Sequence, residues 1–153
     1  GKKVAETLVE LGVPFEITVA SAHRTPEDAV AYARKAAARG LKVLVGIAGL
    51  SAALPGVLAA HTNLPVIGVP VSSGTLGGKD ALLAVTQMPP GVPVASVGID
   101  AGKNAAILAV RILALDDASL AERLGSLNRA AVSKTREDRK EMEGLPVAPP
   151  EAF

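Results

Sequence analysis

The spacing of apolar residues near the start of the chain predicts two helices with a strand between them. Val4, Leu8 and Leu11 recur at helical intervals over residues 2–11, and the following glycine can end that helix as a C-terminal cap. Residues 14–20 are rich in β-branched and aromatic types and predict a strand. A second helix is expected over residues 26–39, before another glycine.

Three near-continuous apolar runs predict buried parallel strands, because a strand covered on both faces has no polar side. These runs span residues 41–48, 64–69 and 92–98. The segments between them predict a helix over 51–61, which Pro55 and Gly56 would kink or divide, and a second helix over 79–88.

The remainder of the chain predicts two helices and a tail. Residues 101–115 form a strongly apolar helical pattern, and residues 119–143 form a charged amphipathic one. The proline-rich segment 146–150 predicts an extended, non-helical conformation. We therefore expect one α/β domain over 1–143 and a tail over 144–153.

This alternation of strands and helices with short connections predicts a doubly wound parallel sheet, with helices on both faces and a further C-terminal helix. A three-layer, flavodoxin-like α/β fold is the expected class. The chain opens on a helical pattern, whereas a sheet of this kind normally opens on a strand whose following loop carries part of the ligand site.

Composition narrows the functional classes. Hydrophobic residues make up 49% of the 153 residues but aromatic ones only 2%, so the core must consist of small aliphatic side chains. The net charge of +1 gives no sign of a nucleic-acid or membrane partner, and the absence of cysteine excludes disulfides and thiolate chemistry. With two histidines far apart, a metal site is not expected. No apolar run is long enough to span a bilayer and no signal peptide opens the chain, so a cytoplasmic location is expected.

The segment Ser21–Ala22–His23–Arg24–Thr25–Pro26 is the main candidate for chemistry. It joins the predicted strand 14–20 to the predicted helix 26–39, and ligands bind at such strand-to-helix loops in open α/β sheets. A helix N-terminus and a guanidinium both suit an anion, while histidine titrates near neutral pH. The segment thus predicts an anion clamp beside a proton carrier, although Thr25 and Pro26 also make an ordinary helix start with a threonine cap.

Two further loops follow predicted strands. Ala48, Gly49, Leu50 and Ser51 end one strand, and Ser51 can alternatively be read as a helix cap. Residues 70–78, which include Ser72 and Ser73, form a loop long enough to be a lid or simply a flexible surface loop. His61 lies near a helix end and is interpreted as a cap or surface residue. No Walker loop, dinucleotide fingerprint or nucleophile elbow is present, so the residues alone do not specify a reaction.

Several separate motifs resemble the N5-carboxyaminoimidazole ribonucleotide mutases, the catalytic subunits of bacterial phosphoribosylaminoimidazole carboxylase. The resemblance covers the chain to about residue 133, with the motifs in the family's order. They are Ser21–Pro26, Leu64–Val71, Gln87–Pro89, Gly91–Ala95 and Lys103–Ala106.

This resemblance implies a flavodoxin-like homo-octamer that moves a carboxylate from N5 to C4 of an imidazole ribonucleotide in purine synthesis. It implies no metal, nucleotide or organic cofactor. His23 matches the catalytic histidine, and Ser21, Ala22 and Arg24 match substrate-binding positions around the phosphate. The loops that contain Ala48, Gly49, Leu50, Ser51 and Leu54, and Ser72 and Ser73, match the walls around the imidazole.

Two departures from the family pattern keep alternatives open. The family's N-terminal strand and its Gly-Ser-x-Ser-Asp loop are not found in this chain, and binding is expected to suffer without them. The loop 48–54 has Ala53 where the mutases have histidine, and it lies closer to the pattern of the animal-type enzymes that use free carbon dioxide. The mutase is the preferred interpretation, and the alternatives are the direct carboxylase and a non-catalytic binding or assembly protein on the same fold.

Overall fold

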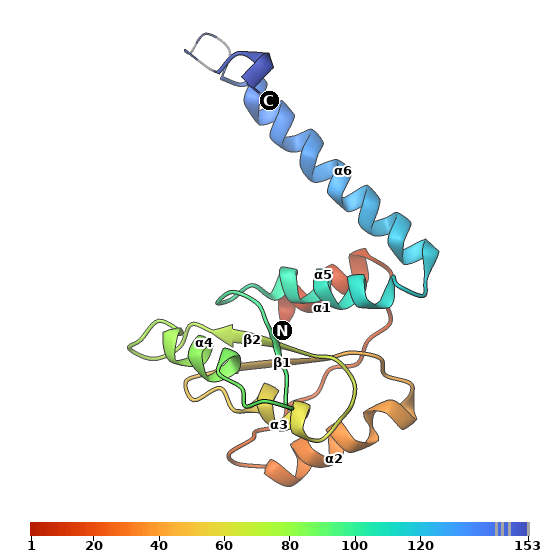
Figure 1. Ribbon diagram of the computed structural model, residues 1–153, viewed down its shortest axis with the longest axis vertical. Coiled ribbons are helices and arrows are strands. Elements are labelled where there is room, and N and C mark those ends of the chain that lie inside the picture. The colour runs from red at the N-terminus through yellow and green to blue at the C-terminus, as the bar shows by residue number, and fades with distance from the viewer. Residues whose placement is uncertain (143, 145, 147, 153) are drawn as a thin grey trace.

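The computed structural model describes residues 1–142, 144, 146 and 148–152. A parallel sheet in the order β1-β2-β3 lies between two layers of helices (Figure 1). Its strands are β1 (Leu44–Gly49), β2 (Val66–Val71) and β3 (Ala95–Ser96). One face is covered by α1 (Lys2–Glu10) and α5 (Gly102–Leu113), and the other by α2 (Pro26–Ala36), α3 (Leu54–Ala60) and α4 (Lys79–Thr86). The predicted three-layer α/β fold is confirmed.

The central strand β2 supplies side chains to both layers, as the period of two in a strand requires. Ile67 and Val69 pack against α5, while Val66 packs toward α2 and α3. Gly46 of β1 and Gly68 of β2 are paired in register. Because neither has a side chain, Pro55 of α3 approaches both strands closely. The close fit of α3 on the sheet therefore depends on these two glycines.

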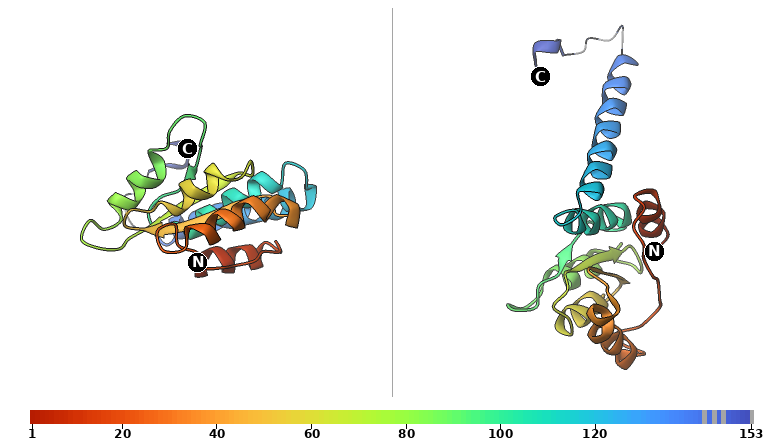
Figure 2. Two further views of the ribbon diagram at one scale, coloured as in Figure 1. Left: turned by 90° about the horizontal axis from the view of Figure 1, so that it is seen from below. Right: turned by 90° about the vertical axis from the view of Figure 1, so that its right-hand side faces the viewer.

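The last helix, α6 (Ala118–Lys140), leaves the body of the protein, as two views at right angles show (Figures 1 and 2). Its N-cap is Asp117, whose Oδ1 accepts hydrogen bonds from the N–H groups of Ser119 at 2.9 Å and Leu120 at 3.1 Å. Leu120 and Leu124 are the buried residues of α6, and both belong to a core shared with α1 and α5. Beyond this first part, the helix projects into solvent.

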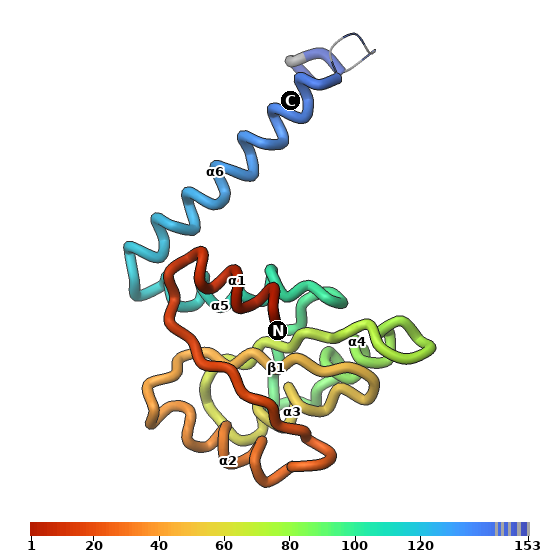
Figure 3. Tube along the Cα trace, turned by 180° about the vertical axis from the view of Figure 1, so that it is seen from behind, coloured from red at the N-terminus to blue at the C-terminus, as the bar shows by residue number. Residues whose placement is uncertain are grey.

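The predicted strand 14–20 is wrong. Residues 13–20 run from α1 toward α2 and cross in front of β1 in the reversed view of Figure 3, but they pair with none of the strands in the described part of the chain. β-Branched and aromatic residues favour an extended backbone, whereas a strand also needs a neighbour to receive its hydrogen bonds. The segment is instead held by Glu16, whose carboxylate accepts a hydrogen bond from the Tyr32 hydroxyl at 2.8 Å and forms an ion pair with Arg39.

Most other elements are confirmed with shifted ends. The run 92–98 is a strand only at β3, because its other residues form no ladder with β2. The helix expected at 51–61 begins at Leu54, so Pro55 lies in its first turn and does not kink it. The helix expected over 26–39 ends as a short 3-10 turn, η1 (Ala37–Arg39), before Gly40, whose φ is 87°.

The tail contains one correction. The 3-10 turn η2 (Pro150–Ala152) lies in a segment expected to be non-helical. A proline can begin such a turn because the first residues of a helix need no N–H donor. Residues 143, 145, 147 and 153, which belong to the predicted last helix and the tail, lie outside the described residues. No helix in the described ranges is both long enough and apolar enough to cross a membrane.

Candidate functional site

Four loops gather at one end of the sheet, where the strands end. They are residues 21–25 before α2, 49–53 after β1, 72–78 after β2 and 97–101 after β3. The last three lie near one another at the left of Figure 1 and at the right of the reversed view in Figure 3, and residues 21–25 lie below them on the same side of the molecule. This is the edge where open α/β sheets bind ligands.

The 21–25 loop is held by its own hydrogen bonds. The N–H of Ser21 donates to Thr25 Oγ1 at 2.9 Å, and the N–H of Arg24 donates to Ser21 Oγ at 3.1 Å. The side chains of His23 and Arg24 are exposed, and neither makes a hydrogen bond or ion pair with any described residue. The loop thus presents a free imidazole and a free guanidinium from adjacent positions at the start of an eleven-residue helix.

The predicted side-chain caps at this edge are wrong. Thr25 is the N-cap residue of α2, but its hydroxyl bonds to the backbone of Ser21 and does not cap the helix. Ser51 does not cap α3 either, because that helix begins later and has Ala53 as its N-cap residue. His61 is the C-cap residue of α3, which agrees with its interpretation as a cap. Its Nδ1 lies 2.9 Å from the carbonyl oxygen of Val57 in the same helix.

Backbone strain is concentrated in these loops. Leu50, Ala52 and Asp100 are the non-glycine residues with positive φ in the described part of the chain, at 54°, 21° and 57°. The first two lie in the loop after β1 and the third in the loop after β3. Because positive φ is costly for residues with a side chain, it persists where the surrounding structure imposes it, and it clusters at functional sites.

The loops after β1 and β2 pack against each other. A Cβ placed on Gly49 would overlap the Ser73 hydroxyl, and one placed on Gly74 would lie 2.8 Å from Leu50 Cδ2. Ser73 Oγ and Asp80 Oδ1 are buried oxygens without a hydrogen-bond partner among the described residues. Ser73 therefore holds an unsatisfied hydroxyl between the two loops, close to the Gly49 backbone.

Asp100 joins the loop after β3 to the loop after β2. Its Oδ1 accepts a hydrogen bond from the Ser72 N–H at 3.1 Å, and its Oδ2 accepts one from the Ser72 hydroxyl. These hydrogen bonds hold the pKa of Asp100 below its usual value of 3.8. This pair could not be found from the sequence, since the two residues lie 28 positions apart and belong to no common motif.

The remaining predicted site residues are distributed around these loops. Ala48 and Gly49 end β1, and Ser51 is exposed in the turn that follows. Leu54 is the first residue of α3 and packs against the core between α2 and the sheet. Ala22 lies half-buried in the 21–25 loop. Contacts thus join the loops after β1, β2 and β3. Among described residues, the hydrogen bonds of the 21–25 loop lie within it or join Thr25 to Asp28 and Ala29 in the first turn of α2.

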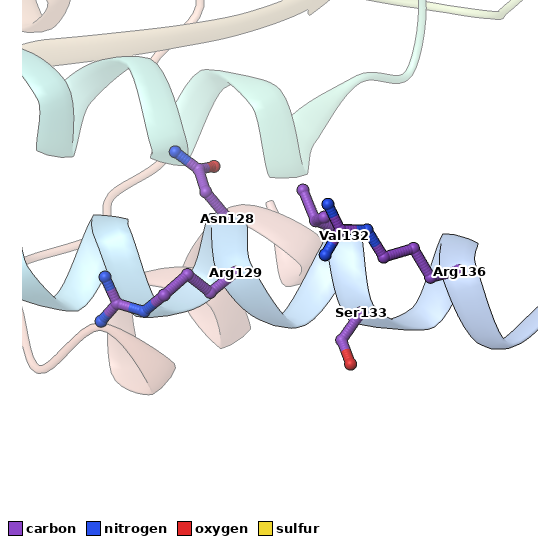
Figure 4. Close-up of a pocket in the computed structure, with 5 residues that line it drawn as sticks. All are labelled: Asn128, Arg129, Val132, Ser133 and Arg136. Carbon is purple, nitrogen blue, oxygen red and sulfur yellow. The ribbon is translucent and has the colours of Figure 1, made fainter. Parts of the chain in front are cut away.

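A separate hollow of about 340 Å³ lies along α6 (Figure 4). Its lining residues are Asn128, Arg129, Val132, Ser133 and Arg136. All five come from one exposed helix, so the hollow is an open depression on α6 and not an enclosed site. In the residues that the structure describes, no group of three or more histidine, cysteine, aspartate or glutamate side chains is arranged to hold a metal ion.

Comparisons with known proteins find relatives that cover most of this chain. A Pyrococcus horikoshii protein named N5-carboxyaminoimidazole ribonucleotide mutase is 50% identical over 144 residues, which cover 94% of this chain and 81% of that one. A Schizosaccharomyces pombe phosphoribosylaminoimidazole carboxylase is 56% identical over 119 residues, which cover 78% of this chain and 22% of that one. The crystal structure of Treponema denticola PurE matches with a TM-score of 0.84 at 31% identity, over 93% of this chain and 89% of that chain. Residues 1–134 match the family AIRC, AIR carboxylase, and the chain belongs to that family.

Proposed function

We propose that this protein interconverts N5-carboxyaminoimidazole ribonucleotide and 4-carboxy-5-aminoimidazole ribonucleotide in purine synthesis. The mutase name of the Pyrococcus horikoshii relative supports this assignment. The observation that carries it in the structure is the adjacent, unpaired His23 and Arg24 at the ligand-binding edge of the sheet.

The proposed reaction moves one carboxylate and one proton. The N5–carboxylate bond breaks to give carbon dioxide, and N5 gains a proton. C4 then attacks carbon dioxide through its ring electrons, and the C4 proton leaves. The electrons balance without an oxidant or reductant, so the task for the protein is to hold carbon dioxide and carry the proton.

His23 is the proposed proton carrier. The proton that leaves C4 and the proton that N5 gains can pass through one imidazole, because its two ring nitrogens can accept and donate a proton. In the described structure the His23 ring is free of internal hydrogen bonds, so both of its nitrogens remain available for a substrate.

The other site residues are proposed to bind the nucleotide. Arg24 and the 21–25 loop would hold the phosphate, since a guanidinium forks onto phosphate oxygens. The Gly49–Leu54 and Ser72–Leu76 segments would surround the imidazole. Retaining carbon dioxide requires a pocket closed to water, and the 72–78 loop is the proposed lid.

A pair of histidine variants tests this assignment. His23→Asn should lower kcat by roughly two orders of magnitude or more, the usual contribution of general acid–base catalysis, with substrate affinity little changed. His61→Asn is the matched control, because His61 lies at the end of α3 and bonds to its own helix. Equal turnover for the wild type and His23→Asn would exclude His23 from the chemistry.

The second candidate is direct carboxylation of aminoimidazole ribonucleotide by dissolved carbon dioxide. The loop Ala48–Leu54 favours it, because Ala53 replaces the histidine expected in a mutase. The carboxylase name of the Schizosaccharomyces pombe relative is also consistent with it. The two reactions differ in the source of the product carboxylate, which isotopic labelling identifies.

We also propose a cytoplasmic homo-octamer. Support comes from α6, a 23-residue helix whose buried residues are confined to its first part. Further along it, Val132 is 49% exposed, and a long helix with unpacked apolar residues gains stability by packing against another subunit. Light scattering on the purified protein tests this assembly: the mass should be eight times that of one chain, and a monomer at micromolar concentration would contradict it.

A further inference from the structure

Asp100 occupies a strained position that no motif explains. Its φ of 57° is in the left-handed region, which aspartate tolerates better than most residues. Its backbone N–H donates to the carbonyl oxygen of Pro70 at 2.9 Å, near the end of β2. Two residues beyond Pro70, its carboxylate accepts hydrogen bonds from both the N–H and the hydroxyl of Ser72. Asp100 therefore extends the pairing with β2 beyond the last residue of β3.

The contacts around Asp100 fix both ends of the 72–78 loop. The loop begins at Ser72, which Asp100 holds directly. It ends at Gly78, which is buried and has a φ of 84°. A Cβ on Gly78 would lie 3.0 Å from Ile99 Cγ2 and 3.0 Å from Ser72 Cα. The two ends of the loop thus meet next to the residue that precedes Asp100.

The position of these two ends determines which neighbouring residues the rest of the 72–78 loop can contact. Ser73 follows Ser72 directly, and its hydroxyl lies against Gly49 in the loop after β1. Gly74 contacts Leu50 in the same way. If Ser72 were released, no hydrogen bond between described residues would keep Ser73 and Gly74 against the loop after β1.

We propose that Asp100 is a positioning residue that holds the 72–78 loop closed over the imidazole site through its two hydrogen bonds to Ser72. This inference rests on the proposed function, because it assigns the loop a role in retaining carbon dioxide. A loop that opens during the reaction would let carbon dioxide escape before C4 captures it. The lowered pKa of Asp100 means that the carboxylate is ionised, and able to accept both bonds, at neutral pH.

Two measurements on the full protein test the proposal. The first is the amide hydrogen-exchange rate at Ser72. The second is the fraction of isotopic label that escapes to solution, relative to the fraction transferred, when substrate carries a labelled N5-carboxylate. This ratio is independent of the amount of active protein, so a general loss of folding does not change it.

Four variants give the comparison. Asp100→Ala and Asp100→Gly each remove both bonds, and glycine adopts the φ of 57° without strain, so both variants should speed Ser72 exchange roughly tenfold and raise the escape ratio roughly threefold or more. Asp100→Asn keeps an oxygen for the Ser72 N–H and an amide that can donate to its hydroxyl, so both readouts should return toward wild type. Asp116→Ala is the control, because that exposed carboxylate makes no side-chain bond with a described residue.

The possible results separate the inference from the function on which it rests. An unchanged amide hydrogen-exchange rate at Ser72 in Asp100→Ala would show that the Asp100–Ser72 hydrogen bonds do not hold the loop, whether or not the wild type transfers label. Faster exchange with an unchanged escape ratio would overturn the role of Asp100 in carboxylate retention. A wild-type protein that transfers no label would refute the proposed function. The exchange measurement would still show whether Asp100 holds the loop through Ser72.

Discussion

Replacing Gly68 with alanine should destabilise the protein, although glycine is normally a poor strand residue. The new Cβ would lie closer than 3.0 Å to Val85 Cγ1, about 3.0 Å from Val94 Cγ1 and 3.3 Å from Pro55 Cβ. Val85 is fully buried in α4, so it cannot turn into solvent. Overpacking of this kind costs about 1–3 kcal/mol, and the stiffer unfolded chain offsets about 0.4–1 kcal/mol. The midpoints of these two ranges differ by about 1.3 kcal/mol, so we expect a net loss of that size in the free energy of unfolding.

Urea denaturation at one fixed protein concentration measures this loss, and Gly125→Ala provides the control. A Cβ on Gly125 of α6 would meet only the movable end of Arg129, at 3.2 Å, so the same substitution should stabilise the helix by up to about 1 kcal/mol. In the double variant Gly68→Ala/Val85→Ala, the cost should be less than the sum of the two single costs, because alanine at 85 makes room for the new methyl. A Gly68→Ala protein as stable as wild type, or additive costs in the double variant, would refute the proposed packing of the helices on β2.

Three further predictions concern other parts of the molecule. Arg123→Ala should lower the free energy of unfolding by about 1 kcal/mol, as measured by urea denaturation, because its Nη1 donates to the Leu11 carbonyl oxygen at 2.7 Å. The N–H of Leu120 donates a hydrogen bond to the Asp117 carboxylate and holds the pKa of Asp117 below its usual 3.8. The ionised carboxylate therefore stabilises the fold above that pH, and this contribution is lost as the pH falls through the lowered pKa. Acid titration followed by circular dichroism should show that loss in the wild type and not in Asp117→Asn. Arg24→Ala should weaken nucleotide affinity by about 1.5–3 kcal/mol in calorimetry, with Arg24→Lys intermediate, because a lysine keeps the charge but not the fork; unchanged affinity would exclude Arg24 from the phosphate site.

The sequence was most informative where the pattern and the physics are local. The continuous apolar run at β2 predicted a buried parallel strand, because a strand covered on both faces has no polar residues. The glycines after α1 and η1 marked helix ends for an equally local reason, since both adopt positive φ. The candidate loop around His23 was located from the order of an extended segment, a polar loop and a helix. The structure has the same order, although the extended segment forms no ladder with a strand.

Features that depend on distant partners could not be predicted. The strand expected at 14–20 was wrong because β-branched and aromatic residue types do not reveal whether a neighbouring strand is available. The hydrogen bonds between Asp100 and Ser72 join two loops, and neither residue has an unusual local context. The close approach of Pro55 to Gly46 and Gly68 likewise results from the packing of α3 on the sheet, which the residues of the two strands do not reveal.

The source of the product carboxylate shows whether the protein transfers the N5-carboxylate to C4 or uses dissolved carbon dioxide. Substrate labelled with carbon-13 at its N5-carboxylate would be turned over once in the presence of unlabelled bicarbonate, and the carboxyl carbon of the product analysed by mass spectrometry. We predict that most of the label appears on C4 in the wild type, and that His23→Asn forms almost no product in the same time. A product that carries carbon from the unlabelled bicarbonate would contradict this prediction and assign the protein to direct carboxylation.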